Sequence, residues 1–137
     1  MSMSSRQFAH WLYRYRVAWE QGDPDAVVAL FSEDAAYHET PFDPPMVGAA
    51  AIRRYWEDGA RDGQADVRFE AEITGIDGSI GYAWWRARFT RTPGSSMVQL
   101  DGILRATFDD TGRCTTFREW WHRRETPAES AGDDRDF

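Results

Sequence analysis

The spacing of apolar residues changes once along this chain, near residue 66. Before that point apolar residues recur every three or four positions, which is the period of an amphipathic helix. After it they alternate with polar residues, as in strands that bury one face. Helices followed by an antiparallel run of strands give an α+β order. We therefore predict one α+β domain, in which three N-terminal helices pack on a strongly curved antiparallel sheet and form a cone.

Three helices are expected before the change of period. The first carries one apolar stripe, which consists of Phe8, Trp11, Leu12, Tyr15, Ala18 and Trp19. Asp23 followed by Pro24 supplies an N-cap side chain and a first-turn proline for a short second helix that reaches Phe31. A third helix is expected to open at Gly48 and to be over by Gly63.

The strands are expected mainly after residue 66. The four long strands of the predicted sheet span residues 67–74, 80–92, 97–108 and 113–124. A brief extended segment, 35–40, is expected between the helices and the sheet, closed by the proline-rich residues 41–45. Residues 125–137 hold five acids and one Arg, and they are expected to form a mobile acidic tail.

Charge and composition argue against several classes of partner. The formal net charge is −7, and the sixteen cations, all Arg, are scattered, whereas nucleic-acid-binding proteins carry a clustered basic face. No stretch approaches the roughly 20 consecutive apolar residues of a membrane span, and the first residues lack the apolar run of a secretory signal. We expect a cytoplasmic protein with no nucleic-acid or membrane partner. His10, His38 and His122 are dispersed, so no metal is expected, and no cofactor motif is present.

Glu119 is a polar residue on a strand face that is otherwise aromatic. It shares that face with Phe117 and Trp121. If the face points into the cone, burial disfavours the charged carboxylate and raises the pKa of Glu119, which makes it a candidate acid or base. The alternative is that Glu119 pairs with an inward Arg123 or lies at the rim.

Glu39 and Tyr15 are two further candidates. Glu39 shares parity with Tyr37 in the segment that precedes Pro41, so a packed segment would aim its carboxyl into a cavity; the alternative is a solvated carboxylate at the rim. Tyr15 lies on the buried stripe of the first helix, where a phenol usually has a hydrogen-bond partner. It is either a core residue or a donor to a ligand.

The order and spacing of these elements resemble a known superfamily. The resemblance rests on the first helix, Gly22-Asp23, the proline-rich stretch, Gly48 and the final strand, in which Phe108-Asp109 and Gly112-Arg113 precede Trp120-Trp121-His122. These features are similar to the nuclear transport factor 2-like superfamily with its cystatin-like cone, and within it to the SnoaL-like proteins. The resemblance spans roughly residues 8–124 and implies a SnoaL-like domain over residues 5–124.

The ketosteroid isomerases of this superfamily imply roles for individual residues. Tyr15 falls where they keep the oxyanion-hole tyrosine, and Glu39 falls where they keep the carboxylate base. Leu104 falls where they keep a protonated aspartic acid as second donor, so that donor is missing here. Trp85 and Trp121 match pocket-lining aromatic residues.

The expected ligand is a small hydrophobic molecule bound in an aromatic pocket. The residues expected to line or floor this pocket are Trp19, Trp56, Phe69, Trp85, Leu104, Phe117 and Trp121. One hypothesis is a cofactor-free proton-transfer enzyme, isomerase- or cyclase-like, with Glu39 as base, Tyr15 as donor and Glu119 as second donor; His38 is the next candidate base. A second is a non-catalytic ligand-binding or accessory domain, and a third is a dimeric interaction module.

A homodimer is expected through the convex face of the sheet. By strand alternation that face carries Trp84, Arg86, Arg88, Ile103, Arg105, Trp120 and His122. Aromatic and Arg anchors are typical of interfaces, and members of the resembled superfamily commonly pair in this way. The alternative is a monomer in which Arg side chains stack over the Trp rings.

Overall fold

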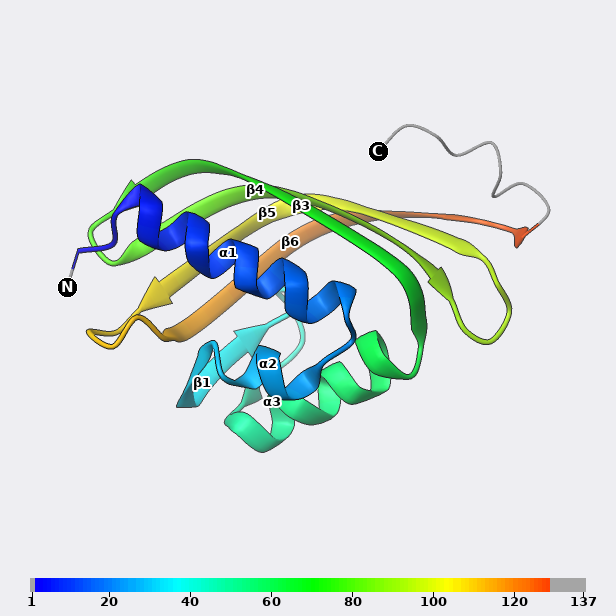
Figure 1. Cartoon of the computed structure of the whole chain (residues 1–137), viewed down its shortest axis with the longest axis horizontal. Coiled ribbons are helices and arrows are strands. Elements are labelled where there is room, and N and C mark those ends of the chain that lie inside the picture. The colour runs from blue at the N-terminus through cyan, green and yellow to red at the C-terminus, as the bar shows by residue number, and fades with distance from the viewer. Residues whose placement is uncertain (1, 129–137) are drawn as a thin grey trace.

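A single curved sheet of six strands forms the body of the protein, and it wraps around one long helix (Figure 1). The computed structural model describes residues 2–128. The helices are α1 (Ser5–Glu20), α2 (Pro24–Val28) and α3 (Ala49–Trp56), and α3 continues into a π-helical turn, η1 (Glu57–Arg61). The strands are β1 (Phe31–His38), β2 (Met46–Val47), β3 (Gln64–Asp77), β4 (Ile80–Arg91), β5 (Met97–Phe108) and β6 (Cys114–Thr126), in the spatial order β2-β1-β6-β5-β4-β3.

The helix termini follow the local chemistry of the sequence. Ser4 and Gln7 form a reciprocal capping box at the start of α1, and the buried face of α1 is the stripe predicted from its spacing. Asp23 caps α2 by accepting a hydrogen bond from the Ala26 backbone N–H. The second helix ends at Val28, earlier than predicted, because Phe31 already pairs with β6 as the first residue of β1.

The prediction of a four-stranded sheet was wrong, since two more strands join it. β1 pairs in parallel with β6 and in antiparallel fashion with β2. The register of β1 against β6 shifts between Phe31 and Ala36, and Glu33 and Asp34 in that interval are exposed. This irregularity removes the apolar alternation by which strands are recognised, so the sequence pattern revealed only the second half of β1.

The antiparallel meander from β3 to β6 matches the predicted order of strands. The bounds of β5 are those predicted, whereas β6 continues to Thr126 and so includes two residues expected to be in the tail. Glu125 lies in this extension because it accepts hydrogen bonds from Arg91 Nε at 3.1 Å and Ser96 Oγ at 2.5 Å. The remainder of the predicted tail, from residue 129, lies outside the described residues.

The helices close the concave side of the sheet unevenly. α1 runs along that side and packs against β3, whereas α2 and α3 pack together and α3 also contacts β1 (Figure 1). The core between α1 and the sheet is aromatic, with Phe8, Tyr15, Phe69 and Phe117 almost completely buried. Within residues 2–128, no helix is both long and apolar enough to cross a membrane.

Gly102 allows β5 and β6 to approach closely at the middle of the sheet. It is paired with Trp121 of β6. A Cβ at this position would lie 2.8 Å from the Trp121 Cα and still closer to the Trp120 carbonyl oxygen. Glycine inside a strand often marks such a close backbone approach or a bend. Gly102 is therefore a structural requirement of the curved sheet.

Replacing Gly102 with alanine should destabilise the fold. We expect Gly102→Ala to lower the free energy of unfolding by on the order of 1–3 kcal/mol, because the added methyl group meets backbone atoms that cannot move aside alone. Gly75→Ala in β3 is the matched control, since a Cβ there has no neighbour within 4 Å. Urea unfolding of both variants measures the effect, and equal unfolding midpoints would contradict it.

Candidate functional site

A cavity of about 240 Å³ lies between the end of α1, α3 and the inner face of the sheet. Its wall combines eight aromatic side chains with two carboxyl groups and two guanidinium groups. The lining residues are Tyr15, Trp19, Tyr37, Glu39, Tyr55, Trp56, Gln64, Trp85, Phe89, Arg91, Val98, Leu100, Glu119, Trp121 and Arg123. Segments that are far apart in sequence thus meet at one site.

A chain of hydrogen bonds links two tyrosines to Glu119. The Tyr37 hydroxyl donates to Glu119 Oε1 at 2.8 Å, and the hydroxyl oxygens of Tyr15 and Tyr37 are 3.0 Å apart. Because Tyr37 has one hydroxyl hydrogen and gives it to Glu119, it accepts a hydrogen from Tyr15. α1, β1 and β6 each contribute one member of this chain.

Glu119 is a carboxyl group that keeps its proton at neutral pH. Only 7% of the residue is exposed, and this burial, together with the charge of Glu39, raises the pKa of Glu119 to about 8, although the hydrogen bond from Tyr37 and the nearby Tyr15 hydroxyl oppose the shift. Burial also raises the pKa of Tyr15 and of Tyr37 well above the ordinary value. All three groups are therefore protonated near pH 7.

Glu39 lies beside this chain, since Glu39 and Glu119 each follow the His38–Arg118 pair of β1 and β6, and it is held from two sides. It directly follows β1 and is half-buried. Its carboxylate accepts a hydrogen bond from the Tyr55 hydroxyl, and its backbone carbonyl accepts one from Trp121 Nε1 at 3.0 Å. The Tyr55 ring packs 5.4 Å from the ring of Tyr37. The two carboxyl groups are thus set within one aromatic frame.

Aromatic rings make up the wall between Glu119 and the open end of the cavity. Trp56 stands edge-on to Tyr15 and to Trp19, with ring centroids 5.5 Å apart in each case. Trp85 packs against Trp19 at 6.1 Å. Among residues 2–128, the buried indole N–H groups of Trp56 and Trp85 have no hydrogen-bond acceptor. The wall therefore suits a flat, mainly apolar molecule.

The open end of the cavity is polar. Trp19 Nε1 donates to Gln64 Oε1 at 2.7 Å, which fixes the start of β3 against α1. Arg91 forms an ion pair with Glu125 at 3.1 Å. Arg123 carries the second guanidinium group at this end. It lies on β6, which β5 separates from the β4 strand of Arg91. A ligand in the cavity would meet carboxyl groups at the closed end and positive charge at the mouth.

Most of the residues proposed from the sequence meet in this cavity. Tyr15, Glu39 and Glu119 all line it, and of the two orientations left open for Glu119 the structure has the inward one. Four of the seven expected pocket residues also line it, namely Trp19, Trp56, Trp85 and Trp121. What each of these residues does there stays a prediction.

Four of the proposed residues do not line the cavity. Phe69, Leu104 and Phe117 are almost completely buried in the core, and Phe117 is covered by the ring of Tyr37 stacked 4.8 Å from it. His38 follows the inward-facing Tyr37 on β1 and so points to the other face, where partial burial and the charge of Arg118 lower its pKa. The expectation that Phe69, Leu104 and Phe117 line or floor the pocket took no account of depth in the core, and His38 was expected only as the next candidate base after Glu39.

The sequence reasoning missed residues that complete the site. Tyr37 could have been found, because it shares parity with Glu39. The spacing of the third helix places Tyr55 on its apolar side, although a phenol on such a face needs a partner. Gln64 and Arg91 gave no signal, since each lies at the end of a strand whose position depends on the curvature of the sheet.

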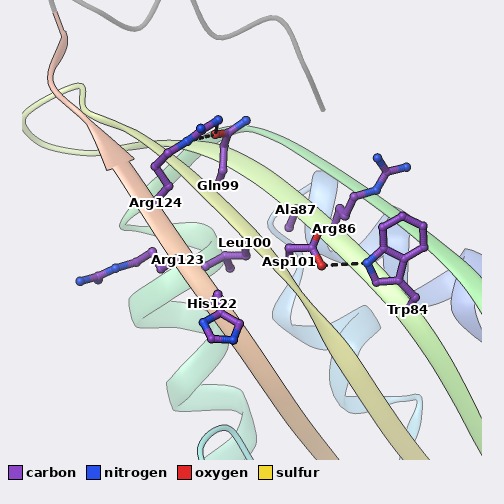
Figure 2. A pocket seen from close by; sticks show the side chains of 9 residues that line it. All are labelled: Trp84, Arg86, Ala87, Gln99, Leu100, Asp101, His122, Arg123 and Arg124. Atoms are coloured by element: carbon purple, nitrogen blue, oxygen red, sulfur yellow. Dashed lines mark hydrogen bonds between the residues drawn. The ribbon is translucent and has the colours of Figure 1, made fainter.

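A second, shallower hollow of about 460 Å³ lies on the outer face of the sheet (Figure 2). The Trp84 indole donates to Asp101 at 2.8 Å, and Arg86 lies 4.8 Å above the Trp84 ring. Arg124 reaches toward Gln99, to which it donates at 2.7 Å, whereas Arg123 extends away from it (Figure 2). This hollow lies on the face where the sequence predicted a contact between protomers.

The buried carboxyl should make stability depend on pH. A group whose pKa rises from 4.5 to about 8 on folding stabilises the fold fully below pH 4.5, and this contribution is lost as pH rises through about 8. Between about pH 5 and pH 9, wild type should lose on the order of 4 kcal/mol of unfolding free energy relative to Glu119→Gln. Urea unfolding at several pH values measures this difference, and parallel curves for the two proteins would contradict it.

Comparison with known proteins places the chain in a family. The SnoaL-like domain model matches residues 12–117. A steroid Δ-isomerase from Nocardioides simplex is 31% identical over 109 residues, which cover 79% of this chain and 84% of that protein. The structure of SalBIII, described as an epoxide hydrolase/cyclase-like enzyme in pyran ring formation in the polyether salinomycin, shares the fold with a TM-score of 0.75 at 23% identity, covering 87% of this chain and 93% of that one. The chain belongs to the SnoaL-like domain family of the nuclear transport factor 2-like superfamily.

Proposed function

We propose that the protein is a cofactor-free enzyme that moves a proton between two carbons of an enolisable carbonyl compound. The observation that carries this proposal is that one aromatic cavity holds a buried, protonated carboxyl, Glu119, and a half-buried carboxyl, Glu39. Two carboxyl groups in different environments can divide the work of acid and base. The similarity to a steroid Δ-isomerase supports the same class of reaction.

Glu39 is the base in this scheme. In its ionised form, one carboxylate oxygen takes a proton from the carbon next to the substrate carbonyl. The electron pair of the broken C–H bond forms a C=C bond, and the carbonyl π electrons move to oxygen to give an enolate. Glu39 then returns the same proton to a different carbon, so that no electrons or atoms are gained or lost. The bond from Tyr55 holds the carboxylate in position.

The Tyr15–Tyr37–Glu119 chain is the donor to the enolate oxygen. With Glu119 protonated, the three groups carry three hydrogens, and their two internal hydrogen bonds use two of them. The third hydrogen remains at one end of the chain and can be donated to the enolate oxygen. Such donors stabilise the negative charge that develops there. When Glu119 ionises, only two hydrogens remain and both are used internally. The proton on Glu119 therefore enables donation to the substrate.

The position of Glu119 compensates for a donor that the sequence comparison found missing. Leu104 stands where the ketosteroid isomerases are expected to keep a protonated acid, and Glu119 is the residue paired with Leu104 on the adjacent strand. The carboxyl group thus reaches the cavity from β6 instead of β5. This supports a proton-transfer role over the non-catalytic alternative.

Deuterium exchange tests this proposal. We expect the protein to catalyse exchange at the acidic carbon of 2-tetralone, a neutral bicyclic ketone, in D₂O followed by proton NMR. Glu39→Gln should abolish exchange almost entirely because it removes the base, and Tyr15→Phe should slow it by on the order of 100-fold because it removes one hydrogen of the donor chain. His38→Gln is the matched control, since His38 points away from the cavity.

The pH dependence of exchange separates the two carboxyl groups. Exchange should fall as pH rises through about 8, where Glu119 loses its proton. Glu119→Gln retains a neutral N–H donor, so this fall should disappear in that variant. Exchange that survives Glu39→Gln undiminished would place the base elsewhere, and bound 2-tetralone without exchange would favour the non-catalytic alternative.

We further propose that the protein forms a homodimer through the outer face of the sheet. Trp84, Ile103 and Trp120 form one row across β4, β5 and β6, because each is paired with the next. Their exposed fractions are 37%, 40% and 43%. Such a row of large apolar side chains with flanking guanidinium groups is the composition of an interface centre.

Sedimentation equilibrium at micromolar concentration tests the dimer. We expect a species of twice the 15.8 kDa protomer mass, and we expect Ile103→Glu to convert it to monomer by placing a charge in the centre of the row. Tyr13→Glu, at an exposed residue of α1, is the control and should leave the dimer intact. A wild-type species of protomer mass would contradict the proposal.

A further inference from the structure

Three side chains of β6 form a line from the closed end of the cavity to its mouth. Glu119, Trp121 and Arg123 are two residues apart, so they share the inner face of the strand, and all three line the cavity. At about 3.3 Å per residue, Glu119 and Arg123 are roughly 13 Å apart along the strand. The line therefore presents an acid, an aromatic surface and a cation to one ligand.

Arg123 is a positively charged residue at the mouth of the cavity, and no ion pair within residues 2–128 neutralises its guanidinium group. Arg91 is already paired with Glu125, which also accepts from Ser96, and Glu39 accepts from Tyr55. Within residues 2–128, the structure gives the Arg123 guanidinium no hydrogen bond or ion pair; its charge reaches Glu125 only at a distance, where it helps to lower the pKa of that carboxyl. The group is thus available to an anion.

Strand parity separates Arg123 from its neighbour Arg124. β1 pairs with β6 only as far as Arg118, so the later part of β6 is a sheet edge and Arg123 also borders the outer hollow. Arg124 has the opposite parity and donates to Gln99 at 2.7 Å on the outer face, while Arg123 extends away from that pair (Figure 2). Arg124 therefore serves as a matched control for Arg123.

We infer that the ligand carries a carboxylate at the end opposite its carbonyl oxygen, and that Arg123 binds this carboxylate at the mouth of the cavity. A guanidinium group binds a carboxylate through two parallel hydrogen bonds, which also fixes the direction of the ligand. The direction assigned here rests on the proposed function, in which the carbonyl oxygen meets the Glu119 end. The cavity, of about 240 Å³, is smaller than the usual ligand pocket of about 300–1,000 Å³, which favours a keto acid with a compact, flat ring system.

Calorimetric titration with a matched pair of probes tests this inference. The probes are 6-hydroxy-2-naphthoate, in which a phenol and a carboxylate stand at opposite ends of a flat body, and its uncharged methyl ester. At about pH 6.5 and low salt, we expect the acid to bind wild type at least tenfold more tightly than the ester. Arg123→Gln should reduce the affinity for the acid to that for the ester and leave the affinity for the ester unchanged. Arg124→Gln should keep the preference for the acid.

Three results would overturn the inference. These are equal affinity of wild type for acid and ester, a preference that survives Arg123→Gln, and a preference that Arg124→Gln removes equally. Exchange of neutral 2-tetralone depends on Glu39 and needs no anionic group. Failure of the carboxylate preference is therefore distinguishable from failure of the proton-transfer proposal.

Discussion

The burial of one carboxyl group, Glu119, among aromatic rings is the constraint on which the rest of the site depends. An ionised carboxylate in such surroundings is costly, whereas a protonated carboxyl that accepts a hydrogen bond from Tyr37 is tolerated. The fold thus keeps the proton on Glu119 at neutral pH. In the proposed mechanism, that proton is the extra hydrogen that the Tyr15–Tyr37–Glu119 chain donates to the substrate.

Because the sheet is curved, the Glu119 carboxyl group lines a cavity and is not enclosed in a fully packed core. Gly102 lets the backbones of β5 and β6 approach where Trp121 faces inward. Trp121 in turn donates to the backbone of Glu39, which ties the end of β1 to the cavity wall. Fold and site therefore depend on the same strand, β6, since it carries Glu119, Trp121 and Arg123 and pairs with both β1 and β5.

The sequence predicted those parts of the molecule that have a local pattern. The stripe of α1, the order of the meander and the face that Glu119 shares with Phe117 and Trp121 follow from periods of 3.6 and 2. The first half of β1 was missed because a register shift breaks its alternation. The sequence pattern of a strand shows which face a side chain is on, but not how deeply it lies inside the cone. Phe117 and Leu104 were therefore expected at the cavity, although they lie in the core. Arg91 and Gln64 reach the site only through the curvature of the whole sheet.

The protonation state of Glu119 is the quantity that tests this account most directly. In protein labelled with ¹³C at the side-chain carboxyl carbons of glutamate, an NMR titration follows each carboxyl separately, and Glu119→Gln assigns the signal. The account predicts that this one resonance remains in the protonated form at neutral pH and titrates near pH 8. A Glu119 resonance that titrates near the ordinary value of 4.5 would contradict it, because the donor chain would then have no hydrogen to offer at neutral pH.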